Sequence, residues 1–290
     1  MSPRLRRAAR NPYLILLVPA LVWLVVFFLI PLGMVFLYSF QTRNPDGTIA
    51  WTFQLGNYLR LLRPLQDEFP PNYVVIILRS LWMAALTTFL CLLIGYPFAY
   101  GLARSSLRWR NTLVLLVVIP FWTNFLIRTY AWRFLLWRRG LFDTLAQGLG
   151  LGEFVLHGTP TAVVIGLVYG YLPFMILPLY ITLERMDRSL IEAAYDLGAS
   201  PWRAFWRVTV PLSRPGIIAG SVLVFIPSAS AFVTPKLLGG AKSMMLGELV
   251  EMQFKAVRDW PFGSAAGFVL MALVLLLVAL YFRAVGAEEF

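Results

Sequence analysis

The chain has 290 residues, of which 59% are hydrophobic and 13% are charged. Soluble domains carry about 25% charged residues, so this composition excludes an ordinary soluble protein and predicts an all-α polytopic membrane protein. The formal net charge is +11, but most arginines flank apolar runs, which favours contact with anionic membrane lipid over nucleic-acid binding. With one cysteine and one histidine, neither an intrachain disulfide nor a Cys/His zinc site can be built.

Six apolar runs are long enough to cross a membrane, which takes about 20 residues. They are Tyr13–Phe36, Val74–Leu102, Leu113–Ile127, Ala162–Ile181, Gly216–Val233 and Gly263–Phe282. The third reaches full length only if Asn111 or the residues after Arg128 join it. The first is too long for a signal peptide's apolar region and lacks a small-residue cleavage site. We therefore expect a short segment, residues 1–12, followed by a single transmembrane domain, residues 13–290.

The orientation of these spans follows from the lysines and arginines near their ends. Basic residues are nearly as numerous on one side as on the other, but they are denser in the short loops on the side of the N-terminus. The longer loops on the opposite side also carry several acidic residues. This pattern predicts that both termini, and with them the polar insert Ile191–Pro211, lie in the cytoplasm.

The insert, "IEAAYDLGASPWRAFWRVTVP", has the local signals of two short helices. Ser189 and Glu192 have the S-x-x-E spacing of a capping box, which predicts the start of the first helix. Gly198 offers a left-handed residue to end it. Ser200 can cap the second helix, and Pro201 suits the first helical position, where no backbone N–H is needed.

In the second of these helices, spacing separates an apolar face from a basic strip. Trp202, Phe205 and Trp206 fall at positions i, i+3 and i+4, whereas Arg203 and Arg207 are four residues apart. From the residues alone, the insert is either an amphipathic element in the lipid headgroups or a docking surface for a soluble partner.

The same stretch resembles the EAA loop of ABC importer permeases, with the pattern E-A-A, three residues, Gly, nine residues, I-x-L-P. Five residues match in register, whereas Val208 and Val210 replace the usual Ile and Leu; the matching residues are Glu192, Ala193, Ala194, Gly198 and Pro211. In that family the loop docks on the ATPase subunit. The resemblance thus implies a set of ATPase-coupling residues, namely Glu192, Ala193, Ala194, Gly198, Pro201 and Arg203.

Further stretches are similar to the spermidine/putrescine branch of that family, among them "IPFWTNFLIRTYAW", "GLVYGYLPFMILPLY" and "RDWPFGSA". The resemblance implies the type I importer permease fold in the inner membrane, with a core at about 74–283 and a coupling loop at about 184–213. It also implies four kinds of partner: a second, related permease forming a heterodimer, two ATPase subunits, an extracytoplasmic solute-binding protein, and membrane lipid. The chain itself would be non-catalytic and bind no cofactor or metal, because ATP would be used by the partner ATPase.

An energy source within the chain is not indicated. The stretch "GGAKS" departs from a P-loop, since Ala241 replaces the glycine before the lysine. A self-contained secondary transporter, the alternative class, would commonly carry intramembrane ionisable residues, whereas the six apolar runs contain no Asp, Glu or Lys. We therefore expect alternating access driven by ATP hydrolysed in a partner.

The substrate expected from the resemblance is a polyamine, which would be recognised by carboxylates and aromatic faces. Glu251 and Asp259 are the candidate cation contacts at the outer mouth; alternatively they are solvated loop charges or contacts of the binding protein. Prolines that free backbone carbonyls favour positions facing a wet cavity, although small residues also serve helix packing. The candidate pathway residues are Tyr169, Pro173, Pro227, Ser228, Ser230 and Phe232. The sequence "SAS" after Pro227, where an acidic residue is usual in that branch, leaves another small organic or cationic solute open.

Overall fold

The computed structural model describes residues 12–62, 72–240 and 243–286, so the predicted segment 1–12 lies outside the described residues except for Pro12. The described chain divides into two compact units: residues 12–62 with 252–269 form the first, and residues 72–251 with 270–286 form the second. The division falls within the last helix, α16 (Trp260–Gly286).

The first unit begins with one long helical segment made of α2 (Pro12–Leu24), the π-helical turn η1 (Val25–Leu29) and α3 (Ile30–Tyr38). A two-stranded antiparallel hairpin follows, β1 (Thr42–Arg43) and β2 (Ile49–Ala50), and then α4 (Gly56–Leu62). The unit is completed by η4 (Gln253–Val257) and the start of α16. The buried Asn57 side chain donates to the carbonyls of Ser39 (2.9 Å) and Gln41 (2.8 Å), which fixes α4 at the end of α3.

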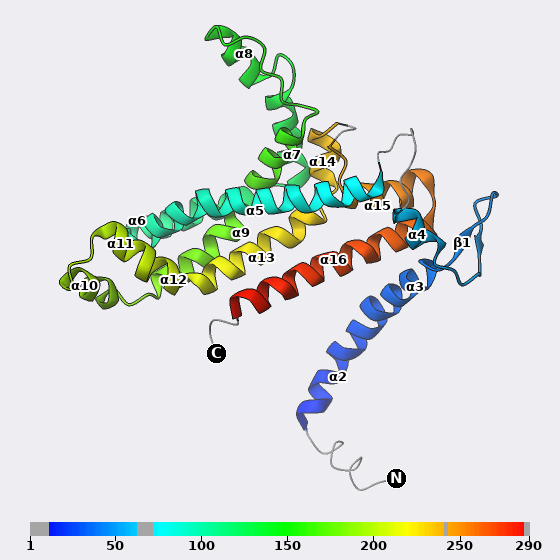
Figure 1. Ribbon diagram of the computed structural model, residues 1–290, viewed down its shortest axis with the longest axis horizontal. Helices are drawn as coiled ribbons and strands as arrows, with labels where there is room; N and C mark the ends of the chain where they lie inside the picture. Colours follow the sequence, from blue (N-terminus) through cyan, green and yellow to red (C-terminus); the bar gives the residue numbers. More distant parts are fainter. Residues whose placement is uncertain (1–11, 63–71, 241–242, 287–290) are drawn as a thin grey trace. The chain divides into compact units, whose positions relative to one another are not determined.

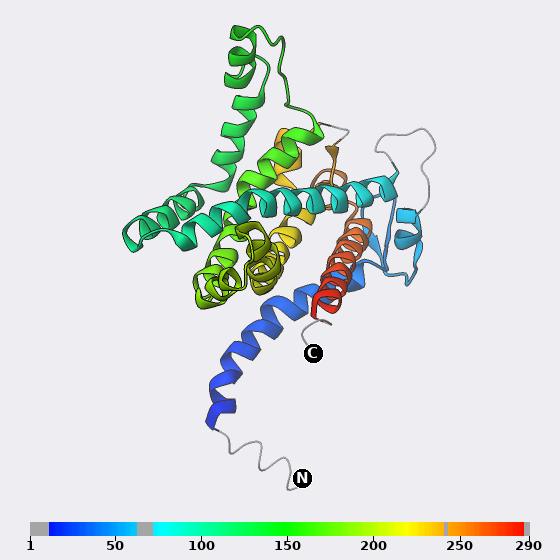
Figure 2. The same ribbon diagram turned by 60° about the vertical axis from the view of Figure 1, so that its left-hand side comes forward.

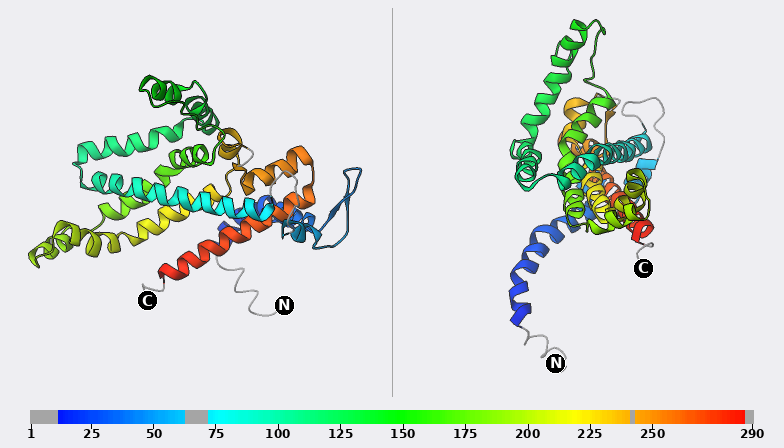
Figure 3. Two further views of the ribbon diagram at one scale, coloured as in Figure 1. Left: turned by 45° about the horizontal axis from the view of Figure 1, so that its top comes forward. Right: turned by 90° about the vertical axis from the view of Figure 1, so that its left-hand side faces the viewer.

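The second unit contains the remaining helices. In chain order they are α5 (Tyr73–Arg104), α6 (Leu107–Trp122), α7 (Phe125–Leu136), α8 (Leu141–Gly148), α9 (Pro160–Glu184), α10 (Ser189–Asp196), α11 (Pro201–Ala204), η2 (Phe205–Thr209), α12 (Val210–Leu212), α13 (Arg214–Ala229), α14 (Val233–Leu238) and α15 (Leu246–Met252). Helices α5, α9 and α13 lie side by side (Figure 1), and Figure 3 shows the coupling loop at one end of α9 and α13.

The core of the second unit lies between these three helices. Met175 and Leu179 of α9 are fully buried against Cys91 of α5 and Val224 of α13. Gly220 of α13 allows a close approach to α9, because an added Cβ would lie 2.7 Å from the Met175 sulfur. Small residues of this kind bring membrane helices into direct contact, so the α9–α13 packing depends on the absence of a side chain at Gly220.

Four of the described helices are long and apolar enough to cross a membrane, and two bent pairs raise the number to six if each pair is one span. The bent pairs are Leu107–Trp122 with Phe125–Gly148, at 91°, and Pro201–Leu212 with Arg214–Ala229, at 63°. The predicted all-α membrane fold is confirmed.

The predicted third span, Leu113–Ile127, is wrong as a straight helix, because α6 ends at Trp122 and α7 turns away from it (Figure 2). Asn124 starts α7 by accepting the Leu126 N–H at 2.8 Å. The freed carbonyl of Pro120 accepts from the Thr123 hydroxyl and from Arg128 Nη1, both at 2.7 Å. Since backbone groups within a membrane need partners from the protein, these side chains make the break possible.

Candidate functional site

The coupling loop contains the two short helices expected from its sequence. Gly198 has φ +81°, and its N–H donates to the Tyr195 carbonyl at 2.8 Å while the Ala199 N–H donates to the Ala194 carbonyl at 3.0 Å. Ser200 Oγ accepts from the Arg203 N–H at 3.4 Å. The predicted left-handed glycine and serine cap are therefore confirmed.

The predicted capping box at Ser189 is wrong. Arg188 already has helical backbone angles, so Ser189 is the first residue of α10 and its side chain makes no cap. The Ser189 N–H instead donates to Asp187 Oδ1 at 2.9 Å. Hydrogen bonds from Ser189 lower the pKa of the Asp187 carboxyl, and a carboxylate at a helix start also suits the helix dipole.

Most of the expected ATPase-coupling residues lie on the surface of this loop. Glu192, Ala193, Gly198, Pro201 and Arg203 are exposed, and Ala194 is partly buried. Ile191 is buried under α10 and holds the helix against the rest of the second unit. The loop thus presents a continuous outward surface on a fixed base.

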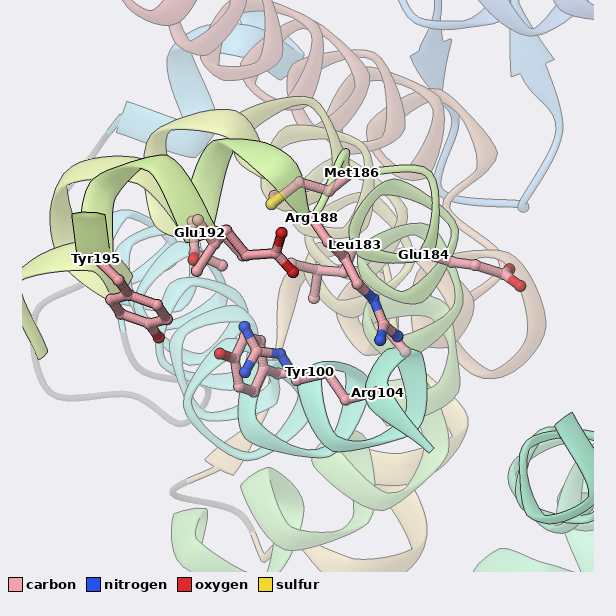
Figure 4. A pocket seen from close by; sticks show the side chains of 11 residues that line it. Tyr100, Arg104, Leu183, Glu184, Met186, Arg188, Glu192 and Tyr195 are labelled. Carbon is pink, nitrogen blue, oxygen red and sulfur yellow. The ribbon is translucent and has the colours of Figure 1, made fainter. Parts of the chain in front are cut away.

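A pocket of about 310 Å³ lies between α10 and the ends of α5 and α9. Glu192 and the guanidinium groups of Arg104 and Arg188 are directed into it (Figure 4). Arg104 is also stacked 4.2 Å from the centre of the Tyr100 ring. Glu192 therefore lies between the outer surface of the loop and two cations on the inner side.

Two residues that no sequence pattern had indicated, Tyr96 and Ser213, attach the loop to the spans. Tyr96 Oη of α5 and Ser213 Oγ form a buried hydrogen bond of 2.8 Å. The ring of Phe205 meets those of Tyr96 (5.6 Å) and Tyr100 (5.7 Å) edge-on. No local signal could identify this contact, because Tyr96 and Ser213 are 117 residues apart in sequence.

The three aromatic residues of the second loop helix contact one another but do not share one environment. Phe205 is partly buried against α5, whereas Trp202 is 71% exposed and Trp206 is 52% exposed. Arg203 and Arg207 are exposed as well. Aromatic and basic side chains together remain available on the outside of the loop.

The expected pathway residues fall into different environments. Ser228 is fully buried and its hydroxyl donates to the Val224 carbonyl at 2.7 Å, so it satisfies its own helix. The Pro227 carbonyl accepts from the Tyr171 hydroxyl at 3.4 Å. Helix α13 ends two residues beyond Pro227, at Ala229.

The other pathway residues differ in exposure. Pro173 is buried within α9, whereas Ser230 and Phe232 are exposed between α13 and α14. Tyr169 packs its ring 5.3 Å from that of Trp132 on α7. The set therefore includes packing positions as well as exposed ones.

Both expected outer-mouth carboxylates have basic partners within their own units. In the second unit, Glu251 accepts from Lys236 Nζ with both oxygens, at 2.8 and 2.9 Å. In the first, Asp259 accepts from Arg60 Nη1 at 2.8 Å and caps α16 by accepting the Phe262 N–H at 3.1 Å. Glu248, which is partly buried near Glu251, was not singled out from the sequence; burial raises its pKa.

The sequence matches a known protein family over most of its length. The family model described as "Binding-protein-dependent transport system inner membrane component" matches residues 92–287. The chain is 42% identical to the spermidine/putrescine transport system permease protein PotB of Escherichia coli K12, over 90% of this chain and 94% of that protein. It is 43% identical to the protein of the same name from Haemophilus influenzae, over 90% of both chains.

Solved structures share the fold at lower sequence identity. A bacterial ABC transporter that imports the polysaccharide alginate has a TM-score of 0.75 at 17% identity, covering 98% of this chain and 99% of the other. The MetNI methionine ABC transporter has a TM-score of 0.53 at 19% identity, covering 74% and 93%. Among the described residues, no group of three His, Cys, Asp or Glu residues could hold a metal ion.

Proposed function

Because the chain belongs to the binding-protein-dependent transport system inner membrane components, we propose that it carries a polyamine such as spermidine or putrescine through the membrane by alternating access. As a multi-pass membrane component it is the non-catalytic, translocating part of an ABC importer. The observation that carries the polyamine assignment is the 42% identity to PotB along 90% of the chain. We assign this chain to the same substrate class on that basis.

The coupling loop is the place at which ATP hydrolysis in the partner would act. Two ATPase subunits, a second related permease and an extracytoplasmic binding protein complete the proposed assembly. The ATPase meets the exposed surface of the loop, whose proposed coupling residues are Glu192, Ala193, Ala194, Gly198, Pro201 and Arg203. The Tyr96–Ser213 hydrogen bond connects this surface to α5, so a displacement of the loop is passed to a span. Such a displacement shifts the access equilibrium only if the ATPase binds the two arrangements with different affinity.

The proposed orientation places the coupling loop and both termini in the cytoplasm. It is supported by the density of arginines in the short loops on that side. We propose one permease domain, residues 13–290, with its core at 74–283 and the coupling loop at 184–213.

The proposed pathway runs past the carbonyl of Pro227 and the exposed Ser230 and Phe232, where α13 ends; Tyr169, Pro173 and Ser228 complete the set. At the outer mouth, Glu251 and Asp259 are the proposed cation contacts. Each is paired with a basic side chain, so an arriving ammonium group has to compete with Lys236 or Arg60. This exchange would hold the amine only transiently, as transport requires.

Co-expression with the neighbouring ATPase, permease and binding protein, followed by reconstitution into vesicles, tests the proposal. We expect uptake of labelled spermidine that needs ATP and the binding protein. Gly198→Trp should abolish ATPase assembly, because it places a large side chain on the docking surface. Gly150→Trp is the matched control, since both glycines are exposed, have a positive φ (+81° at Gly198 and +74° at Gly150) and have open space around the missing Cβ. Uptake without the ATPase would contradict the importer mechanism, whereas ATP-dependent uptake of a different solute would contradict only the polyamine assignment.

A further inference from the structure

A second pocket, of about 440 Å³, lies on α7 and the turn after it, and none of its lining residues belongs to the proposed coupling or pathway sets. It is lined chiefly by three arginines and three aromatic rings, which are Arg133, Arg138, Arg139, Tyr130, Phe134 and Trp137. Guanidinium groups bind phosphate oxygens through paired hydrogen bonds, and aromatic rings favour the membrane–water interface. We propose that this pocket binds the phosphate of an anionic phospholipid headgroup.

The turn that carries the arginines is held in place by specific contacts. Arg139 has φ +60°, a left-handed conformation that is uncommon for a residue other than glycine. Its N–H donates to Asp143 Oδ2 at 2.7 Å, and Asp143 Oδ1 accepts from the Phe154 N–H at 2.8 Å. At Gly140 an added Cβ would lie 2.7 Å from the Leu135 carbonyl oxygen, so only glycine fits. These contacts therefore fix the backbone position of Arg139 in the turn.

Only one of the three arginines of the pocket forms an ion pair within the described part of the chain, so the pocket keeps a positive charge that favours an anion. Arg138 is paired with Glu153 at 2.9 Å. Arg133 lies 4.9 Å over the ring of Trp137, and neither Arg133 nor Arg139 forms an ion pair within the described part of the chain. Within the described part of the chain, the side chains of Arg133 and Arg139 therefore line the pocket without an ion pair, although the Asp143 carboxylate binds the Arg139 backbone N–H.

The depth of the pocket favours a lipid over a dissolved anion. Leu136 is buried against Ala162, in the first turn of α9, at the end of that span opposite the coupling loop. The Trp137 ring lies 4.2 Å from His157, just before α9 begins. On the helix that carries the pocket, Phe134 is 73% exposed and Ile127 is 70% exposed. A headgroup in the pocket would therefore leave its acyl chains along an apolar helix face.

Native mass spectrometry of the detergent-extracted full-length chain tests this assignment. We expect phosphatidylglycerol to bind about tenfold more tightly than phosphatidylcholine, because both carry the phosphate but the choline ammonium group would be repelled by the arginines of the pocket. Arg133→Gln and the double variant Arg133→Gln/Arg139→Gln should abolish that preference, and Arg139→Lys should reduce it. Arg43→Gln, which removes an exposed cation on the hairpin, is the control and should keep it. Arg133 lies on the regular helix α7, where a glutamine is tolerated. The single variant Arg133→Gln therefore still tests the proposal if the double variant folds poorly.

Three results would overturn the proposal. The first is equal binding of the two lipids, or an unchanged preference in Arg133→Gln. The second is displacement of phosphatidylglycerol by millimolar glycerol phosphate, which would show a site for soluble phosphate. The third is loss of binding-protein-stimulated ATP hydrolysis in Arg133→Gln while phosphatidylglycerol binding is unchanged, which would show a protein contact.

Discussion

The hydroxyl groups of Tyr96 and Ser213 lie 2.8 Å apart and join α5 to the point where the coupling loop enters α13. Ser213 Oγ also donates to the Val210 carbonyl at 2.9 Å. Since a serine hydroxyl has one proton, Tyr96 must be the donor in the bond between them. This bond lies at the 63° bend between residues 212 and 214, where the loop joins the span.

Tyr96→Phe should therefore uncouple the loop from α5 without unfolding the protein. The change removes the donor but keeps the ring that contacts Phe205. A buried neutral hydrogen bond contributes about 1 kcal/mol, so a small fall in melting temperature is expected, together with fewer spermidine molecules taken up per ATP hydrolysed in proteoliposomes.

Tyr100→Phe is the matched control for this measurement, because its ring meets Phe205 at a similar distance, 5.7 Å. It should leave the ratio of uptake to hydrolysis unchanged. An unchanged ratio in Tyr96→Phe would show that the loop transmits its movement by another route.

A pair of substitutions at Gly198 separates the backbone role of this residue from its place on the docking surface. Its φ of +81° strains an alanine by roughly 1–2 kcal/mol, whereas asparagine tolerates this region better. Neither side chain meets a neighbour within the chain, because no atom lies within 4 Å of the added Cβ. We expect Gly198→Ala to lower the melting temperature of the permease more than Gly198→Asn does.

Both variants should nevertheless retain less ATPase on co-purification, and the larger asparagine should retain less than alanine does. Normal retention in Gly198→Asn would place Gly198 outside the contact with the ATPase.

The sequence was sufficient for features whose causes lie within a few residues. The cap at Ser200 and the left-handed Gly198 were predictable because each depends on a hydrogen bond to a residue three positions away. The bend after Trp122 was not, since the apolar run continues through it and the partners that satisfy Pro120 become evident only in three dimensions. The same holds for Tyr96 and Ser213, whose contact depends on the packing of α5 against α13.

Substitutions of Asp259 distinguish its structural roles from the proposed contact with substrate. Asp259→Asn loses the ion pair with Arg60, which is half-exposed and therefore contributes at most about 1 kcal/mol. An asparagine can still cap α16 at the Phe262 N–H, whereas Asp259→Ala cannot, at a further cost of about 1 kcal/mol. We expect the melting temperature to be highest for wild type, lower for Asp259→Asn and lowest for Asp259→Ala.

Uptake kinetics then report on the charge at Asp259. If it receives the cation, Asp259→Asn should raise the KM for binding-protein-delivered spermidine more than its small loss of stability explains. Equal KM values in wild type and Asp259→Asn would assign this carboxylate to structure alone.

The pH dependence of the stability of the protein should show the raised pKa of the Glu248 carboxyl. Burial raises its pKa above the ordinary glutamate value, the nearby Glu251 adds to the increase, and Lys236 opposes it. A raised pKa in the folded state means that the protonated form is favoured there. The contribution of Glu248 to stability is thus fully present below the unfolded pKa, near 4.5, and is lost as the pH rises through the folded pKa. Glu248→Gln cannot ionise, so its melting temperature should rise relative to wild type as the pH increases above 4.5. Glu153→Gln, at a largely exposed carboxylate, is the control, and parallel curves for Glu248→Gln and wild type would contradict the raised pKa.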